Sequence, residues 1–225
     1  MRTIGMGVLT LIALSSVAEA QGLRPVRATR GNVGLGVIVA QPVGDFANFV
    51  NVGGGLAGYG VWTPDPSGTL GIRADGSLII YGSETRHYGF VPLVDVGVTT
   101  TNLIAGLQVG PQVTVGRGNL QAYGFGQLGF SYFGTTSSAD GGYISTTNYD
   151  DVTFATAAGG GLRLQLSHGR HPVALDVGAR YLHNGRTRYL TEGSIHVTGN
   201  AVFISPIESQ ADMVLYQIGV TVGLR

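Results

Sequence analysis

The sequence contains no cysteine and no lysine, and only 12% of its residues are charged. Because there is no cysteine, no disulfide can contribute to the stability of the chain. Thirteen arginines balance thirteen acidic residues, so no net basic charge attracts nucleic acid, and we expect no nucleic-acid partner. An average soluble domain has about 25% charged residues. This chain therefore lacks about half of the charge with which such a domain covers its surface.

Long apolar runs are also absent beyond the first twenty residues, where none reaches the roughly 18 residues that a transmembrane helix needs. The composition is nevertheless apolar, with 44% hydrophobic residues and a mean hydropathy of +0.24, which excludes a disordered chain. Such a chain either buries its apolar surface in a core or turns it toward lipid. Besides the helix, only a closed β-barrel can cross a bilayer.

The first twenty residues have the pattern of a secretory signal peptide. Arg2 is followed by a short apolar stretch and by an A-x-A cleavage sequence at residues 18–20. We predict a signal peptide over residues 1–20, a periplasmic N-terminal linker over 21–31 and a barrel over 32–225.

Most of the remaining chain alternates apolar and polar or small residues with a period of two, which predicts β-strands. The expected strands are Val33–Val39, Gly53–Trp62, Thr69–Gly82, Leu103–Val115, Leu120–Phe133, Val152–Ser167, Val173–Tyr181 and Val214–Leu224. The connections between them are alternately long and short. The long, polar ones are expected at 42–51, 83–99, 134–151 and 184–211. This rhythm is typical of an even-numbered antiparallel barrel with short turns at one end and long loops at the other.

The second and fifth of these strands alternate poorly. In the fifth, Tyr123 and Phe125 lie on the opposite parity from Leu128 and Phe130. An extra residue in one strand of a pair would produce such a change of face. We therefore expect a β-bulge or a register shift there.

The stretch Leu107–Gln112, which runs through a hairpin to Tyr123, and the alternating last strand together resemble the small outer-membrane β-barrels of the OmpA, OmpX and opacity-protein kind. The resemblance implies an all-β fold, an eight-stranded antiparallel up-and-down transmembrane β-barrel, in the outer membrane of a Gram-negative-type bacterium. It also implies outer-membrane lipid and the outer-membrane assembly machinery as partners. In that family the final residue is usually aromatic, whereas here Leu224 precedes Arg225.

If the apolar faces meet lipid, the polar residues on the other face point into the lumen. This lumen polar network is expected to be structural, and it comprises Arg73, Asp75, Gln108, Gln112, Arg163, Gln165, Asp176, Arg180 and Gln217. Charges in so narrow a space must be paired and hydrogen-bonded, and Asp176 is the expected partner of Arg163. Leu162 and Leu164 should face lipid on either side of Arg163.

Aromatic residues fall toward the predicted strand ends, where membrane interfaces favour them. The residues assigned to these interfaces are Tyr59, Trp62, Phe130, Tyr132, Phe133, Tyr181 and Tyr216.

Motifs for cofactors, metals or catalysis are weak. Gly124–Gly129 matches G-x-G-x-x-G but lies in a predicted strand with no helix after it, so we expect no cofactor. His168 and His171 lie on a short turn without further metal ligands, and we expect no metal. Some eight-stranded barrels are lipid A deacylases, but the His-x-Ser-Asn pattern of that family is absent after His183. We therefore expect no enzymatic activity.

Three functions fit these observations. The first is a non-enzymatic, monomeric outer-membrane barrel with a structural, adhesive or surface-interaction role. The second is a narrow pore or transporter for small or apolar solutes. The third is a secreted, lipocalin-like barrel that binds an apolar ligand. The third needs charges on the outside, and this chain has few.

Overall fold

The computed structural model describes residues 30–91, 94–116, 118–139, 145–191, 194–198 and 201–224. The predicted signal peptide, nearly all of the predicted linker and Arg225 lie outside the described residues. No helix in the described ranges is both long and apolar enough to cross a membrane.

Strands account for nearly all of the regular structure. The barrel strands are β1 (Gly31–Pro42), β2 (Gly53–Trp62), β3 (Leu70–Val91), β4 (Val94–Val115), β5 (Leu120–Ala139), β6 (Ser145–Gln165), β7 (Val173–Asn184) and β12 (Met213–Leu224). Between β7 and β12 lie the short strands β8 (Arg186–Tyr189), β9 (Ile195–Thr198), β10 (Ala201–Ile204) and β11 (Ile207–Gln210). A short 3-10 helix, η1 (Gly44–Asn48), joins β1 to β2.

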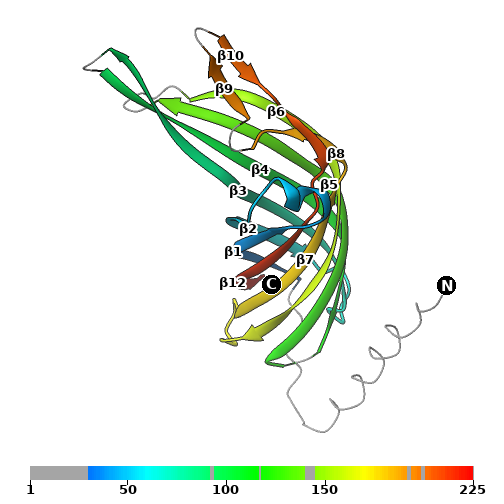
Figure 1. Ribbon diagram of the computed structural model, residues 1–225. Coiled ribbons are helices and arrows are strands. Elements are labelled where there is room, and N and C mark those ends of the chain that lie inside the picture. The colour runs from blue at the N-terminus through cyan, green and yellow to red at the C-terminus, as the bar shows by residue number, and fades with distance from the viewer. Residues whose placement is uncertain are drawn as a thin grey trace, which may run out of the picture.

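The eight long strands close into an antiparallel barrel in the order β1-β12-β7-β6-β5-β4-β3-β2. Closure comes from β1, which pairs with β2 on one side and β12 on the other; β1 and β12 lie side by side in Figure 1. At mid-height, Val37 lies opposite Leu56 and Ile218. The predicted eight-stranded antiparallel fold is confirmed.

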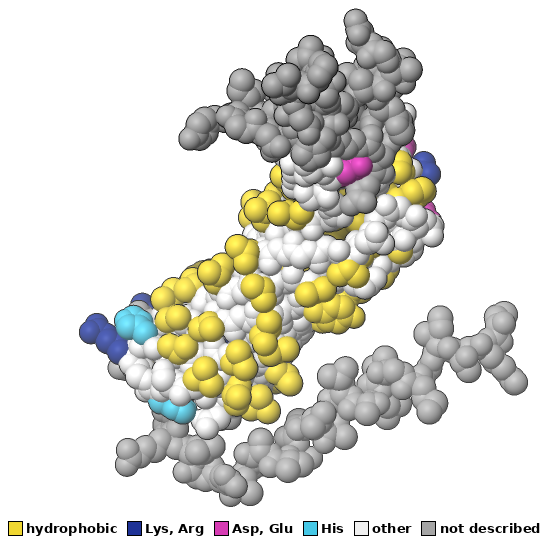
Figure 2. Space-filling model, turned by 60° about the vertical axis from the view of Figure 1, so that its left-hand side comes forward, with side chains coloured by type: hydrophobic (Ala, Val, Ile, Leu, Met, Phe, Trp, Pro, Cys, Tyr) yellow, Lys and Arg dark blue, Asp and Glu magenta, His cyan; other side chains and the backbone are white. Residues whose placement is uncertain are grey.

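The barrel wall is apolar outside and polar or tightly filled inside. On β6, Leu162 and Leu164 are 53% and 45% exposed, whereas Arg163 between them is 6% exposed. This is the alternation that a strand imposes on its side chains. All eight barrel strands contribute exposed large apolar residues, and Figure 2 shows such side chains gathered over one face of the wall. A water-soluble barrel would have the reverse polarity.

The two ends of the barrel differ. At one, which we call the turn end, the connections are residues 63–69, 116–119 and 166–172. Gly68 and Gly116 adopt φ of +76° and +96° there, a backbone conformation that favours glycine. The other end, which we call the mouth end, carries η1, the β3–β4 and β5–β6 hairpins and the segment from β8 to β11.

Two predicted loops are in fact strands. Residues 83–99 and 134–151 were expected as polar loops, but within the described ranges they continue the β3–β4 and β5–β6 hairpins. We call β3 from residue 82, β4 to residue 102, β5 from residue 135 and β6 to residue 151 the protruding sheet, which extends beyond the mouth end in Figure 1. Threonine favours strands, and hydroxyls pair across the ladder, as between Thr85 and Thr99 at 2.9 Å.

The bulge predicted for the second and fifth strands is not found. β2 pairs in one continuous register with both neighbours, and β5 keeps one register with β4 throughout. Its register with β6 shifts only between Thr135 and Thr136, beyond the barrel. The alternation of side chains in β5 is in fact regular. Tyr123 and Phe125 point into the lumen, and Leu128 points out.

The mouth-end half of the lumen is apolar, which the sequence analysis did not predict. Phe46 of η1 is 1% exposed, and its ring centroid lies 5.1 Å from that of Tyr189 of β8 and 5.9 Å from that of Tyr81 of β3. Phe133 of β5 completes the group, 6.4 Å from Phe46. We call these four residues the mouth plug. η1 and β8 thus place Phe46 and Tyr189 inside the barrel and close its mouth end.

The assignment of aromatic residues to the membrane interfaces is only partly correct. Trp62, Phe130, Tyr181 and Tyr216 are exposed on the outside of the wall, as membrane interfaces favour. Phe133 belongs to the mouth plug and Tyr59 is buried in the lumen.

Candidate functional site

The turn-end half of the lumen holds a buried ionic network. Asp75 of β3 receives hydrogen bonds from Arg73 Nε at 2.6 Å and Nη2 at 2.9 Å, from Arg180 Nη1 at 3.0 Å and from Gln127 Nε2 at 2.6 Å. Arg73 and Asp75 are adjacent on one face of β3, whereas Arg180 and Gln127 come from β7 and β5. The four side chains cross the lumen and tie three strands together.

Asp176 is the second carboxylate of the network. The hydroxyls of Tyr59 and Tyr123 donate to it at 2.5 and 2.7 Å, and Arg163 Nε lies 3.5 Å from it. Arg163 stands directly opposite Asp176 in the β6–β7 ladder, so the predicted ion pair is confirmed. Asp176 is 1% exposed; at such burial a charge must be paired.

Glycines make room for the two tyrosines. A Cβ on Gly161 would lie 2.5 Å from the Tyr123 hydroxyl, and a Cβ on Gly34 would lie 2.5 Å from the Tyr59 ring. Both contacts are shorter than packed side chains allow. The lumen-facing glycines are thus part of what lets Asp176 receive its two hydroxyl donors.

The structure brings the predicted lumen residues together, with the exception of Gln165. Gln112 Oε1 accepts from Arg73 Nη1 at 3.2 Å, and Gln108 is 1% exposed beside the network. Gln165 instead donates to the carbonyls of Ser167 and Val173 at the turn end. Gln217 is half-buried, and its Nε2 has no hydrogen-bond partner.

Five members of the network were missed in the sequence analysis: Tyr59, Tyr123, Gln127, Asn32 and Thr221. The bulge expected in β5 obscured which of its residues face the lumen, and Tyr59 was assigned to the membrane interface. The signal was available, because Tyr123, Phe125 and Gln127 share one parity. The guanidinium group of Arg73 stacks on the rings of Tyr59 and Phe125. Its Cζ lies 3.7 Å from the Tyr59 ring centroid and 4.5 Å from that of Phe125, which is a favourable cation–π arrangement.

A cleft of about 430 Å³ opens at the mouth end beside the plug. The loop after η1 (Phe49–Val52) forms one wall, and Tyr81 and Asn102 of β3 and β4 contribute to the other. Its size falls in the range of small-ligand sites. The cleft lies at the base of the protruding sheet.

The segment between β7 and β12 is anchored to the protruding sheet through Asp151. This carboxylate accepts from the Arg188 N–H at 2.7 Å, the Thr187 hydroxyl at 3.0 Å and the Val152 N–H at 2.9 Å. Partial burial raises the pKa of Asp151, but these hydrogen bonds outweigh it and hold the pKa below its ordinary value. The anchoring is therefore complete above the ordinary aspartate pKa and is lost as the pH falls through the lowered one.

We expect Asp151→Asn to loosen this segment, because hydrogen bonds to a charged group contribute about 1.5–3 kcal/mol each. Trypsin can test this, since every basic residue is arginine and Arg186 and Arg188 are exposed. Cleavage after these two should accelerate in the variant. Cleavage after Arg170 in the 166–172 turn is the internal control. Equal cleavage rates in both proteins would contradict the anchoring role.

In the described part of the chain, three histidines and the glycine motif have the following surroundings. His183 Nδ1 lies 2.9 Å from Asp212 Oδ1, while Ser194 bonds to Thr191. His168 and His171 contact Asn119 and Gly223 respectively. Gly124–Gly129 lies within β5. Among the described residues, no group of three or more potential ligand side chains could hold a metal ion.

A closed antiparallel wall with an apolar outside and a polar, ion-paired inside defines the protein as an integral-membrane β-barrel of eight strands. No protein-family model matches the chain, and no curated protein sequence matches it.

The chain is similar to two solved structures of bacterial proteins. Ail, the attachment invasion locus protein of Yersinia pestis, in complex with the heparin analogue sucrose octasulfate, is 10% identical with a TM-score of 0.48, covering 87% of this chain and 98% of that chain. Neisserial surface protein A is 12% identical with a TM-score of 0.40, covering 88% of this chain and 98% of that chain.

Proposed function

We propose that the protein is a monomeric, non-enzymatic barrel of the outer membrane that presents the protruding sheet outside the cell for surface interaction. The observation that carries this proposal is the protruding sheet itself, a four-stranded extension that the barrel does not need for closure. Each chain closes its own barrel, which supports a monomer. Outer-membrane lipid would cover the apolar belt, and the assembly machinery would insert the barrel after removal of the signal peptide.

One edge of the protruding sheet is open. The ladder between β2 and β3 ends at Ile80, whereas β3 continues to Val91, and none of the described strands pairs with the outer edge of that continuation. An unpaired strand edge can add a strand from a partner through main-chain hydrogen bonds. We propose that an extended segment of a partner protein is bound in this way.

Transport and secreted ligand binding receive less support. The mouth plug fills one half of the lumen and the ionic network the other, and both would have to move to open a path. A secreted barrel would leave its exposed leucines, isoleucines and valines in water, an apolar area far larger than monomeric soluble proteins expose.

The surface-interaction role can be tested by shortening both hairpins. Replacing residues 84–100 by Asn-Gly joins the paired residues Ser83 and Thr101, and replacing 136–148 by Asn-Gly joins the paired Thr135 and Tyr149. Expressed in a non-adherent laboratory bacterium, the full protein should promote binding to epithelial cells, and the shortened one should not.

Asp65→Asn, in an exposed turn at the opposite end of the barrel, is the matched control and should bind as the full protein does. Equal adhesion by the full and shortened proteins, both present in the outer membrane, would contradict the proposal.

A further inference from the structure

The buried charges of the lumen do not balance. Among the described residues, the buried charged side chains are Arg73, Arg163, Arg180, Asp75 and Asp176. Three arginines therefore face two aspartates, leaving one excess positive charge in the lumen of a barrel that lipid surrounds under the proposed function. An uncompensated charge in such an environment is strongly destabilising.

The excess charge is shared by Arg163 and Arg180, each of which has one buried donor without a hydrogen-bond partner. Arg73 is bidentate on Asp75, and Arg163 is paired with Asp176. Arg180 shares Asp75 with Arg73 through Nη1, and its Nη2 is buried without a hydrogen-bond partner. Both carboxylates already have several donors, so neither has spare capacity for this group.

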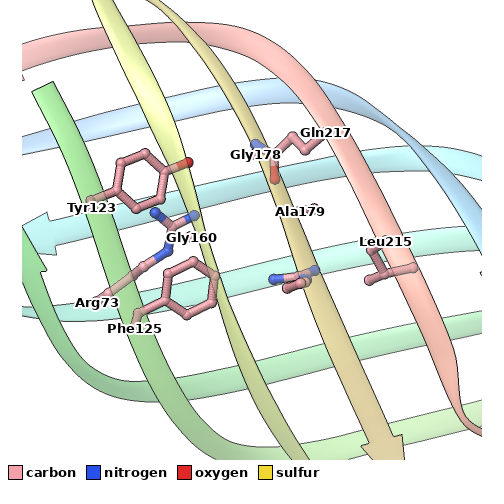
Figure 3. A pocket seen from close by; sticks show the side chains of 9 residues that line it. Arg73, Tyr123, Phe125, Gly160, Gly178, Ala179, Leu215 and Gln217 are labelled. Carbon is pink, nitrogen blue, oxygen red and sulfur yellow. The ribbon is translucent and has the colours of Figure 1, made fainter. Parts of the chain in front are cut away.

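Of Arg163 and Arg180, the latter lines a small cavity. Gln217, Arg73 and Phe125, which are labelled in Figure 3, line it as well. Gln217 stands opposite Gly178 in the β12–β7 ladder, so Arg180, two residues further on, is its diagonal neighbour on the same face. Gln217 Nε2 is a second buried donor without a partner. Two orphan donors from neighbouring strands thus line one cavity.

We propose that this cavity binds one small monovalent anion of the halide class, chloride in the cell. The room for the centre of a water-sized particle is about 10 Å³, roughly that of one water. A sulfate or an organic carboxylate is therefore far too large, and a halide, which is somewhat larger than water, fits once the flexible ends of Arg180 and Gln217 move slightly apart. A water molecule would accept from the two donors but would leave the excess charge uncompensated, whereas a halide satisfies the donors and neutralises the lumen.

Bromide tests the site directly. In crystals of the intact barrel grown in sodium bromide, anomalous diffraction at the bromine edge should give a peak between Arg180 Nη2 and Gln217 Nε2. Density without an anomalous peak there indicates water and overturns the proposal, as does a bromide peak found only at other positions.

The dependence of thermal stability on chloride provides a second test. At constant ionic strength, replacing sodium gluconate by sodium chloride should raise the midpoint of thermal unfolding, because a ligand that binds only the folded state stabilises it. Arg180→Gln removes the excess charge and should abolish the rise. Gln217→Leu keeps all five charges and should reduce it. The same rise in all three proteins, or none in the unsubstituted one, would overturn the proposal. Neither test depends on adhesion, so failure here is distinct from failure of the surface-interaction role.

Discussion

Asp75→Leu is expected to destabilise the inserted barrel by about 3–5 kcal/mol, the cost of removing one member of a buried ion pair. Asp75 accepts four hydrogen bonds, from Arg73, Arg180 and Gln127. Without it, two buried guanidinium groups lose their carboxylate partner. Reversible urea unfolding in phospholipid vesicles would measure the change in the free energy of unfolding.

The double variant Asp75→Leu with Arg73→Leu separates loss of the pair from loss of packing. Replacing a whole buried pair by apolar residues is often neutral, so the double variant should recover part of the loss. The role of the network would be contradicted if Asp75→Leu alone changed the free energy of unfolding by no more than the about 0.5 kcal/mol typical of surface substitutions.

Ile218→Arg is expected to cost about 2–4 kcal/mol, the penalty for an arginine on the lipid face near the bilayer midplane. Ile218 is 51% exposed on the outside of β12 and lies halfway along a twelve-residue strand, opposite Val37 and Val177. It is a better position than Leu164, which lies one residue from the end of β6. The same urea titration in vesicles applies.

The control for Ile218→Arg is an arginine at another depth in the membrane. Val33 is also exposed on the wall but lies near the turn end, at the third residue of β1. Val33→Arg should cost only about 0–1 kcal/mol, because arginine near the interface reaches water. Equal costs at both positions would mean that the wall does not lie in a bilayer.

The barrel could be predicted from the sequence because one face of each strand must meet lipid, which imposes a strict period of two. That period placed Arg163 inside and Leu162 and Leu164 outside. It also identified Asp176 as the partner of Arg163, since the two strands are consecutive and antiparallel.

Features beyond the lipid belt could not be predicted in the same way. The protruding sheet is rich in serine and threonine, and these residues were interpreted as loop residues. The mouth plug depends on Phe46 and Tyr189, two loop residues whose meeting is decided by tertiary packing. Tyr59 was interpreted as an interface residue because a phenol is compatible with both the interface and a polar lumen.

Single-cysteine labelling on intact cells is the most direct test of the central claim, an outer-membrane barrel with its protruding sheet outside. The chain has no cysteine of its own, and both Ser138 on the protruding sheet and Asn119 at the turn end are exposed. A membrane-impermeant maleimide should label Ser138→Cys on intact cells, and should label Asn119→Cys only after the outer membrane is disrupted. Labelling of Asn119→Cys but not Ser138→Cys on intact cells, or recovery of the protein in the soluble fraction, would contradict it.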